Sequence, residues 1–392
     1  MRIEKSKLQL FMTTILMVFG TFLYISDKYV ANYAWIQRGM LFILFFMLAP
    51  YVKILFKNRY SCINFVLLLI MCSAIISGWI NRNGSAQSYT VGLTFAVQIF
   101  LATWYIESII ERGMLHVAIN YFFKIVLFIC LLSDIVMILA PYRITHTRGA
   151  FSYYYLVGSK FDISYLHIIL LFIYVARNLL FYGSIYKNKR EFIVLTAIAF
   201  MVAIYTACAT AIVGLVIFMS VLMLEILSPK GVLCSAGYLG LCNVILIVNY
   251  SVINLPVIKY VIENILHESV ELTGRQGIYL NYLKVFTIDP FFGAGLDNNY
   301  SLSMAFAGAA DMQNGLLDIY LSYGIVGALL FILLYCLAIN AIKKLNSSMA
   351  RPFFAIIIMF VTLSAIEITF RTQMYILLFF AWCICMTLRE DA

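Results

Sequence analysis

Long apolar runs, separated by short polar segments, dominate this chain from end to end. A helix needs about 20 mostly apolar residues to cross the hydrocarbon core of a membrane. Most of the runs reach or approach that length, so the pattern predicts about twelve transmembrane helices. The predicted ranges are 8–26, 36–56, 62–80, 90–110, 115–140, 162–182, 191–208, 210–228, 232–254, 315–342, 352–369 and 372–388.

Two of these ranges need a decision beyond hydropathy. The run from Glu191 to Leu227 lacks a clear break and is too long for one helix of ordinary tilt, so we expect it to fold back at Thr206–Thr210. The first run follows a basic segment, as a signal peptide would. It continues to about Ser26 without an A-x-A cleavage pattern, which predicts a retained first helix.

Composition agrees with a membrane interior. Of the 392 residues, 64% are hydrophobic and 11% are charged, with a mean hydropathy of +0.96. A soluble domain carries about 25% charged residues. The fold class is therefore predicted to be all-α and polytopic, with one integral membrane domain over 1–392 and no room for a second, soluble domain.

Basic residues set the predicted sidedness. The net charge is +9, and many of the cations lie in short loops, which favours membrane topology over nucleic-acid binding. Those loops read as cytoplasmic, and the number of spans then places both termini inside. The loops carry Arg2, Lys5 and Lys7; Lys53, Lys57 and Arg59; Lys187, Lys189 and Arg190; and Lys343, Lys344 and Arg351.

The first long segment on the other side, 141–161, is basic without any acid. It carries Arg143, Arg148 and Lys160, which fit either lipid head groups or an external anionic partner. It also carries Tyr142 and the run 153–155. These rings fit either an interfacial aromatic belt or stacking against sugar faces, and the sequence leaves both pairs of alternatives open.

The second long segment, 255–314, contains a predicted amphipathic helix over 275–288. Thr273 and Gln276 have the spacing of a capping box, and Asp289-Pro290 ends the helix. Arg275 falls in the first turn, where a guanidinium can bind a phosphate by two parallel hydrogen bonds, or can pair with Glu268 or Glu271. The glycines of 293–295 are expected to allow a tight turn near a ligand.

Other chemistry is sparse. Nine cysteines lie in or beside apolar runs, with no spacing of a disulfide framework or zinc site, and no histidine motif or metal cluster is present. No metal or other cofactor is predicted. Glu367 and Arg371 are predicted to share one helix face at the external end of 352–369, where they could form a salt bridge or where Arg371 could reach a phosphate.

Several of these pieces together resemble the O-antigen polymerase and ligase superfamily, and within it the polysaccharide repeat-unit polymerases. The resemblance rests on their order around one long loop. They are Thr273-Gly274-Arg275, Asp289-Pro290, Gly293-Ala294-Gly295, Asn314 and 323–327; the segments 157–161 and 164–167 resemble capsule-type polymerases.

The resemblance implies a metal-independent glycosyltransferase on the external face of the bacterial plasma membrane. It would transfer a growing glycan from undecaprenyl pyrophosphate to a sugar hydroxyl of an incoming lipid-linked repeat unit. Its implied partners are that lipid-linked oligosaccharide, membrane lipid and a chain-length regulator protein. Arg275 is implied as the donor-phosphate residue; Asp311, Asp297 and Glu367 are candidates for accepting the acceptor proton. The substrate-binding candidates are Arg143, Arg148, Lys160, Tyr279, Lys284, Gln313, Asn314 and Arg371.

Two alternatives remain beside the polymerase. An O-antigen ligase would transfer glycan to lipid A-core. Members of that branch commonly have a His-Asn pair where this chain has Gln313-Asn314, and an Arg where it has Ala209-Thr210, and both departures favour a polymerase. A non-enzymatic flippase of lipid-linked glycan would need charges along a path through both leaflets, whereas the polar residues here crowd one side.

Overall fold

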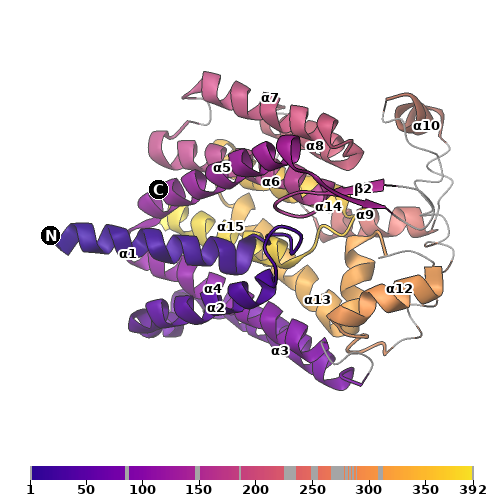
Figure 1. The fold of residues 1–392 in the computed structure, drawn as a ribbon. Coiled ribbons are helices and arrows are strands. Elements are labelled where there is room, and N and C mark those ends of the chain that lie inside the picture. Colours follow the sequence, from indigo (N-terminus) through magenta and orange to yellow (C-terminus); the bar gives the residue numbers. More distant parts are fainter. Residues whose placement is uncertain are drawn as a thin grey trace.

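The computed structural model describes most of the chain and shows a bundle of helices (Figure 1). The described part omits residues 1, 84–87, 146–150, 185–186, 225–234, 249–254, 266–277, 279–280, 282–283, 285–286, 288, 308–311 and 391–392. Within it, seven helices are long and apolar enough to cross a membrane, which is the composition of a membrane protein. They span Tyr33–Phe56, Ser61–Ile80, Tyr89–Glu111, Leu115–Leu139, Lys160–Tyr182, Gly315–Lys343 and Thr372–Arg389.

Every predicted apolar range overlaps a helix. The first half contains α1 (Arg2–Met17, continued by the π-helix Val18–Phe22), α2 (Tyr33–Leu48), α3 (Ser61–Ile80), α4 (Ser88–Glu111), α5 (Leu115–Leu139) and α6 (Lys160–Tyr182). The second half contains α7 (Lys189–Tyr205), α8 (Ala209–Met223), α9 (Ala236–Val248), α13 (Gly315–Lys343), α14 (Ser347–Leu363) and α15 (Thr372–Glu390). The predicted turn at Thr206–Thr210 is confirmed, since α7 ends and α8 begins there.

The chain ends and the loop elements lie at opposite ends of the bundle. Both termini lie at the left of Figure 1, and the short elements of the long loop lie at the right. That loop contains α10 (Pro256–Tyr260), continued by a π-helix at Val261–Ile265, a 3₁₀ turn at Leu296–Asn298 and α12 (Asn299–Ala307). The predicted amphipathic helix 275–288 lies mostly outside the described residues, although Ile278 is buried against the start of α13.

The all-α prediction is confirmed for the fold, and one local exception follows α5. Residues 141–161 were expected to form a loop. They contain an antiparallel hairpin of β1 (Tyr142–Thr145) and β2 (Phe151–Tyr154). Hydropathy could not predict it, because a four-residue strand is too short for a periodic signal.

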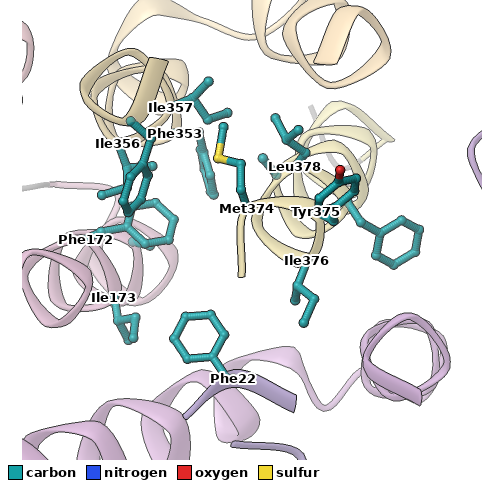
Figure 2. Close-up of a cluster of buried hydrophobic side chains, with 14 of the residues drawn as sticks. Phe22, Phe172, Ile173, Phe353, Ile356, Ile357, Met374, Tyr375, Ile376 and Leu378 are labelled. Carbon is teal, nitrogen blue, oxygen red and sulfur yellow. The ribbon is translucent and has the colours of Figure 1, made fainter. Parts of the chain in front are cut away.

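The core extends through most helices of the bundle, and one part of it lies between α6, α14 and α15. Phe172 and Phe353 are among its buried rings. Figure 2 shows these two rings beside Ile356, with Met374 of α15 facing them, whereas the ring of Tyr375 packs against Phe331 of α13. Because membrane lipid is as apolar as these side chains, close packing rather than water exclusion holds the helices together here.

Helix α13 is broken in its middle. Gly324 has φ 66° and ψ −165°, which no helix contains, and the segment 290–295 lies against the break. The N–H of Ala294 donates to the carbonyl of Leu321 at 2.7 Å, and the N–H of Ile325 donates to the carbonyl of Pro290 at 2.8 Å. The inserted segment thus satisfies backbone groups that the break leaves without helical partners, as a membrane interior requires.

The glycines of both pieces permit this close approach. A Cβ at Gly293, where φ is +69°, would lie 2.6 Å from the backbone nitrogen of Gly324. A Cβ at Gly324 would lie 2.3 Å from the carbonyl carbon of Phe291. The expectation that the 293–295 glycines accommodate a ligand is therefore corrected for Gly293, because its close neighbour is the backbone of α13.

Candidate functional site

A cavity of about 240 Å³ lies where the chain leaves the π-helix after α1, the start of α6 and the segment between α14 and α15 come together. Two of the residues named as candidates from the sequence, Glu367 and Arg371, line it. The polar and charged residues of its lining are Tyr24, Asp162, Tyr165, Glu367, Thr369, Arg371 and Gln373. Within the described residues, this cavity brings together two of the site residues predicted from the sequence.

Asp162 connects Arg371 to the start of α6. One carboxylate oxygen of Asp162 accepts the backbone N–H of Ser159 at 2.8 Å and the Ser159 hydroxyl at 2.7 Å, which forms a capping box. The other oxygen accepts a guanidinium N–H of Arg371 at 3.2 Å. The side chain of Asp162 therefore fixes both the helix end and the arginine.

Gly158 makes room for this carboxylate. It has φ +119°, and a Cβ there would lie 2.6 Å from a carboxylate oxygen of Asp162. The motif 157–161 that carries part of the family resemblance thus shapes one wall of the cavity. Asp162 was missed by the sequence analysis, although Ser159-x-x-Asp162 before an apolar run is itself a capping signal.

The predicted helical pairing of Glu367 with Arg371 is wrong in its geometry. Helix α14 ends at Leu363, and α15 begins only at Thr372, so residues 367 and 371 are not one turn apart on a helix. The intervening segment is held by tertiary bonds: the N–H of Gly315 donates to the carbonyl of Ser364 at 2.8 Å, and the hydroxyl of Thr369 donates to that of Phe360. The ion pair of Arg371 is with Asp162.

The two charged residues in the cavity differ in exposure. The Glu367 residue is only 7% exposed, whereas the Arg371 side chain is 58% exposed. Among the described residues, the Arg371 guanidinium donates only one hydrogen bond, to Asp162. Its remaining donors can therefore bind an anion that enters the cavity, and the Glu367 carboxylate can accept a proton at the cavity wall.

An apolar pocket of about 60 Å³ adjoins the polar cavity inside the bundle. The two share Phe22, Ile169, Phe360 and Gln373 in their linings. Figure 2 shows Phe22 facing the space between Ile173 on α6 and Ile376 on α15, both of which line this pocket. A charged cavity thus lies beside an apolar pocket, an arrangement that suits an amphiphilic ligand.

Other candidate residues are placed elsewhere or bind backbone. The ammonium of Lys160 donates to the carbonyl of Ala207 at 3.0 Å, beside the cavity rather than in its described lining. Asn314 is fully buried, caps α13 through the N–H of Leu317 and donates to the carbonyl of Asn243 at 2.8 Å. These bonds make Asn314 a structural residue at the start of α13, so we do not assign it to substrate.

The remaining candidates do not line the described cavity. Gln313 precedes the Asn314 cap with φ 49°, Lys284 is exposed in the long loop, and Arg143 lies opposite Tyr153 in the hairpin. Arg148, Arg275, Tyr279 and Asp311 lie outside the described residues, as does the Thr273–Gln276 capping box, and so does the side chain of Asp297. Of the cationic candidates Arg148, Lys160, Arg275 and Arg371, only Lys160 and Arg371 lie within the described residues, and only Arg371 lines the cavity.

A buried polar pair elsewhere was also not foreseen. Nε2 of His167 lies 3.3 Å from a carboxylate oxygen of Asp134, and Nδ1 lies 2.9 Å from the carbonyl of Ile163. Since a carbonyl only accepts, the contact with Ile163 requires a proton on Nδ1. The pair joins α5 to α6 within the bundle.

Within the part of the chain that the structure describes, no group of three or more His, Cys, Asp or Glu side chains could hold a metal ion.

Comparison with known proteins adds no relative. No model of a known protein family matches the sequence, and no curated protein matches it. The likeness to O-antigen polymerases rests on the residues quoted for it above.

Proposed function

We propose that this protein is a polysaccharide repeat-unit polymerase of the plasma membrane. In this proposal about twelve helices cross the membrane with both termini cytoplasmic, and the cavity opens on the external face. The growing glycan leaves undecaprenyl pyrophosphate and joins a sugar hydroxyl of the next lipid-linked unit. The motif resemblance supports the reaction class, and the cavity supports the kind of donor.

The observation that carries the proposal is the junction of the two cavities. An undecaprenyl pyrophosphate donor has an anionic head and an isoprenoid tail. The polar cavity offers the free guanidinium donors of Arg371, and the adjoining pocket offers an apolar lining through shared residues such as Phe360. In this proposal the anionic head lies in the polar cavity and the tail leads past the shared residues toward the apolar pocket, so that no charge is placed in hydrocarbon.

The described lining suggests a division of roles. The acceptor oxygen attacks the anomeric carbon as the bond to pyrophosphate breaks, and the electron pair leaves with the pyrophosphate. Glu367 takes the acceptor proton, and Arg371 stabilises the leaving pyrophosphate. The described lining holds two carboxylates, Asp162 and Glu367, but one guanidinium, so we propose that Arg148 and Arg275 supply further positive charge.

The role proposed for Glu367 predicts a large loss in Glu367→Gln. Glutamine keeps the size of the side chain but cannot accept a proton at neutral pH, so polymer formation should fall by about 10²–10⁴-fold. The measurement is the initial rate of polyprenyl pyrophosphate release from lipid-linked repeat units. The control is Glu263→Gln in the long loop, because the Glu263 side chain is 42% exposed and pairs with Lys259. A normal rate in Glu367→Gln would exclude this role.

The proposed topology predicts which positions react from outside. On a cysteine-free background, Asp297→Cys should react with an impermeant maleimide in intact cells, and Asn188→Cys should react only after permeabilisation. Position 297 belongs to the long loop, whereas Asn188 precedes α7 beside basic residues. The opposite labelling pattern would invert the assignment of the two faces.

The proposed binding mode can be tested with a photoreactive donor analogue. A prenyl pyrophosphate carrying a diazirine on its first isoprene unit is irradiated with the purified protein, and the adducts are mapped by mass spectrometry. Adducts are expected on pocket residues such as Ile169, Phe360 and Ile376. Adducts confined to outward-facing positions such as Phe128, which is 63% exposed, would show lipid solvation and contradict donor binding.

A further inference from the structure

Exposed tyrosines lie on both faces of the β1–β2 hairpin. The register pairs Tyr142 with Tyr154 and Arg143 with Tyr153. Because successive side chains of a strand point to opposite faces, Tyr142 and Tyr153 project from opposite sides. Each is 45% exposed, so the hairpin offers an accessible ring in both directions.

The hairpin is fixed by a hydrogen-bonded tyrosine from another part of the chain. The Tyr29 hydroxyl shares its proton between the carbonyls of Ala140, at 2.7 Å, and Tyr154, at 2.9 Å. It also accepts the N–H of Tyr142 at 2.9 Å. Both strands are thereby tied to the segment after α1. Rings on a fixed backbone lose little freedom when they bind, which favours stacking contacts.

The same segments lead directly into the polar cavity. The N–H of Ser26 donates to the carbonyl of Leu156 at 2.9 Å. Tyr24, two residues before Ser26, and Val157, which follows Leu156, both line the cavity. The walls of the cavity are thus continuous with the hairpin. A chain of sugars attached to a pyrophosphate in the cavity would pass these rings as it leaves.

Further aromatic and cationic groups gather around the hairpin. Burial raises the pKa of Tyr155, and the phenols of Tyr205, Tyr153 and Tyr29 raise it further. The Lys28 ammonium lies 5.5 Å from the centre of the Tyr142 ring. Exposed aromatic rings beside hydrogen-bond donors are the features that recognise a pyranose, with its apolar C–H face and its hydroxyl edge.

We propose that the β1–β2 hairpin is a saccharide-binding platform, with Tyr142 as the stacking ring on one face and Tyr153 on the other, that holds the growing glycan next to the cavity. This inference rests on the proposed polymerase function and adds a specific role for the hairpin. Stacking on the platform retains the product between transfers, so that it is extended again before it dissociates. The platform therefore sets polymer length, while the cavity sets the rate of each transfer.

The test compares polymer length with transfer rate in ring variants. Tyr142→Leu and Tyr153→Leu keep an apolar side chain but remove the ring, and together they should shorten the polymer. Each is expected to lower affinity for the repeat-unit oligosaccharide, cleaved from its lipid, by about 2- to 10-fold. The rate of the first transfer should stay unchanged. Tyr153→Trp, which keeps a stacking surface, should retain both length and affinity.

The matched control is Tyr182→Leu at the other end of α6. Tyr182 is 42% exposed and has the Lys187 ammonium 3.9 Å from its ring centre, so it reproduces the exposure and the cation of Tyr142. Polymer length and oligosaccharide binding should not change in this control. An equal shortening in the control would overturn the platform, because it would reflect a general loss of interfacial aromatic rings.

Saturation-transfer NMR with the cleaved oligosaccharide separates this inference from the polymerase proposal. Signal from tyrosine ring protons to sugar protons should appear in the wild type and disappear in the double leucine variant, whether or not polymer forms. Absence of transfer in the wild type would overturn the platform. Polymer of normal length from the double variant would also overturn the platform. The same holds if the double variant differs from the wild type only in a lower amount of protein in the membrane, which would point to an aromatic belt.

Discussion

Arg371→Ala is expected to lower polymer formation by about 10²–10³-fold, because it removes a charge-assisted donor from a site where pyrophosphate charge develops. The protein should remain folded. The Arg371 side chain, which pairs with Asp162, is 58% exposed. Exposed ion pairs contribute only about 0–1 kcal/mol to stability. Arg371→Lys should recover little activity, since an ammonium lacks the two-pronged geometry of guanidinium. The measurement is the initial rate of pyrophosphate-lipid release at saturating acceptor.

The control for this variant is Arg82→Ala. Arg82 donates to the carbonyl of Trp79, and its guanidinium lies 4.4 Å from the Trp79 ring, near the segment that docks on α13. It is an arginine at the same end of the bundle that does not line the described cavity. Its removal should leave the rate within about twofold, in line with the small effects of surface substitutions. Equal losses in both variants would show that positive surface charge in general, rather than the position of Arg371, matters.

Gly324→Ala is expected to have the largest effect on folding. An alanine there must adopt φ +66° and place its Cβ 2.3 Å from the Phe291 carbonyl, where only backbone atoms could yield. Left-handed strain and backbone displacement together should cost on the order of 3–5 kcal/mol. We expect a large drop in the yield of folded protein and in its thermal midpoint in detergent, measured by tryptophan fluorescence and size-exclusion chromatography.

Gly240→Ala supplies the comparison. Gly240 lies in helix α9, and a Cβ there would meet nothing within 4 Å. Replacing it should be neutral or stabilising by about 0.5–1 kcal/mol, because alanine is the better helix former. A thermal midpoint for Gly324→Ala as high as that of Gly240→Ala would contradict the docking of residues 290–295 into the break of α13.

The sequence predicted the helices well where hydropathy alone decides them. Runs near 20 residues gave helices, and the turn at Thr206–Thr210 was located because one run was too long for a single span. Features that depend on distant partners were not predicted. The break at Gly324 follows from its contact with Phe291, 33 positions earlier in the numbering, and no local pattern names that partner.

The candidate site shows the same limit. Glu367 and Arg371, both candidates from the sequence, line one cavity, but their spacing of four assumed a helix that ends at Leu363. The partner of Arg371 is Asp162, more than two hundred positions away, and charge alone could not select it. The sequence can therefore name ionisable residues near the membrane, whereas their pairing requires the fold.

The resemblance motifs also acquire a physical meaning. Gly293 and Gly324 were separate pieces of a family pattern in the sequence, and the fold places their backbones in contact. Ser77 of α3 and Asn81, which directly follows α3, reinforce that contact by donating to the carbonyls of Ser322 and Gly293, respectively. These glycines thus serve the attachment of the long loop to the bundle, whereas the polar cavity is lined by the start of α6 and the segment before α15.

Reconstituted polymerisation tests the proposed function most directly. The purified protein in liposomes is given lipid-linked repeat units in the presence of a chelator, and the products are separated by size. We predict a ladder of polymer together with released polyprenyl pyrophosphate. Transfer of glycan only when lipid A-core is added would identify a ligase, and movement of the lipid between leaflets without a new bond would identify a flippase. Either result, or a strict requirement for a divalent ion, would contradict the account.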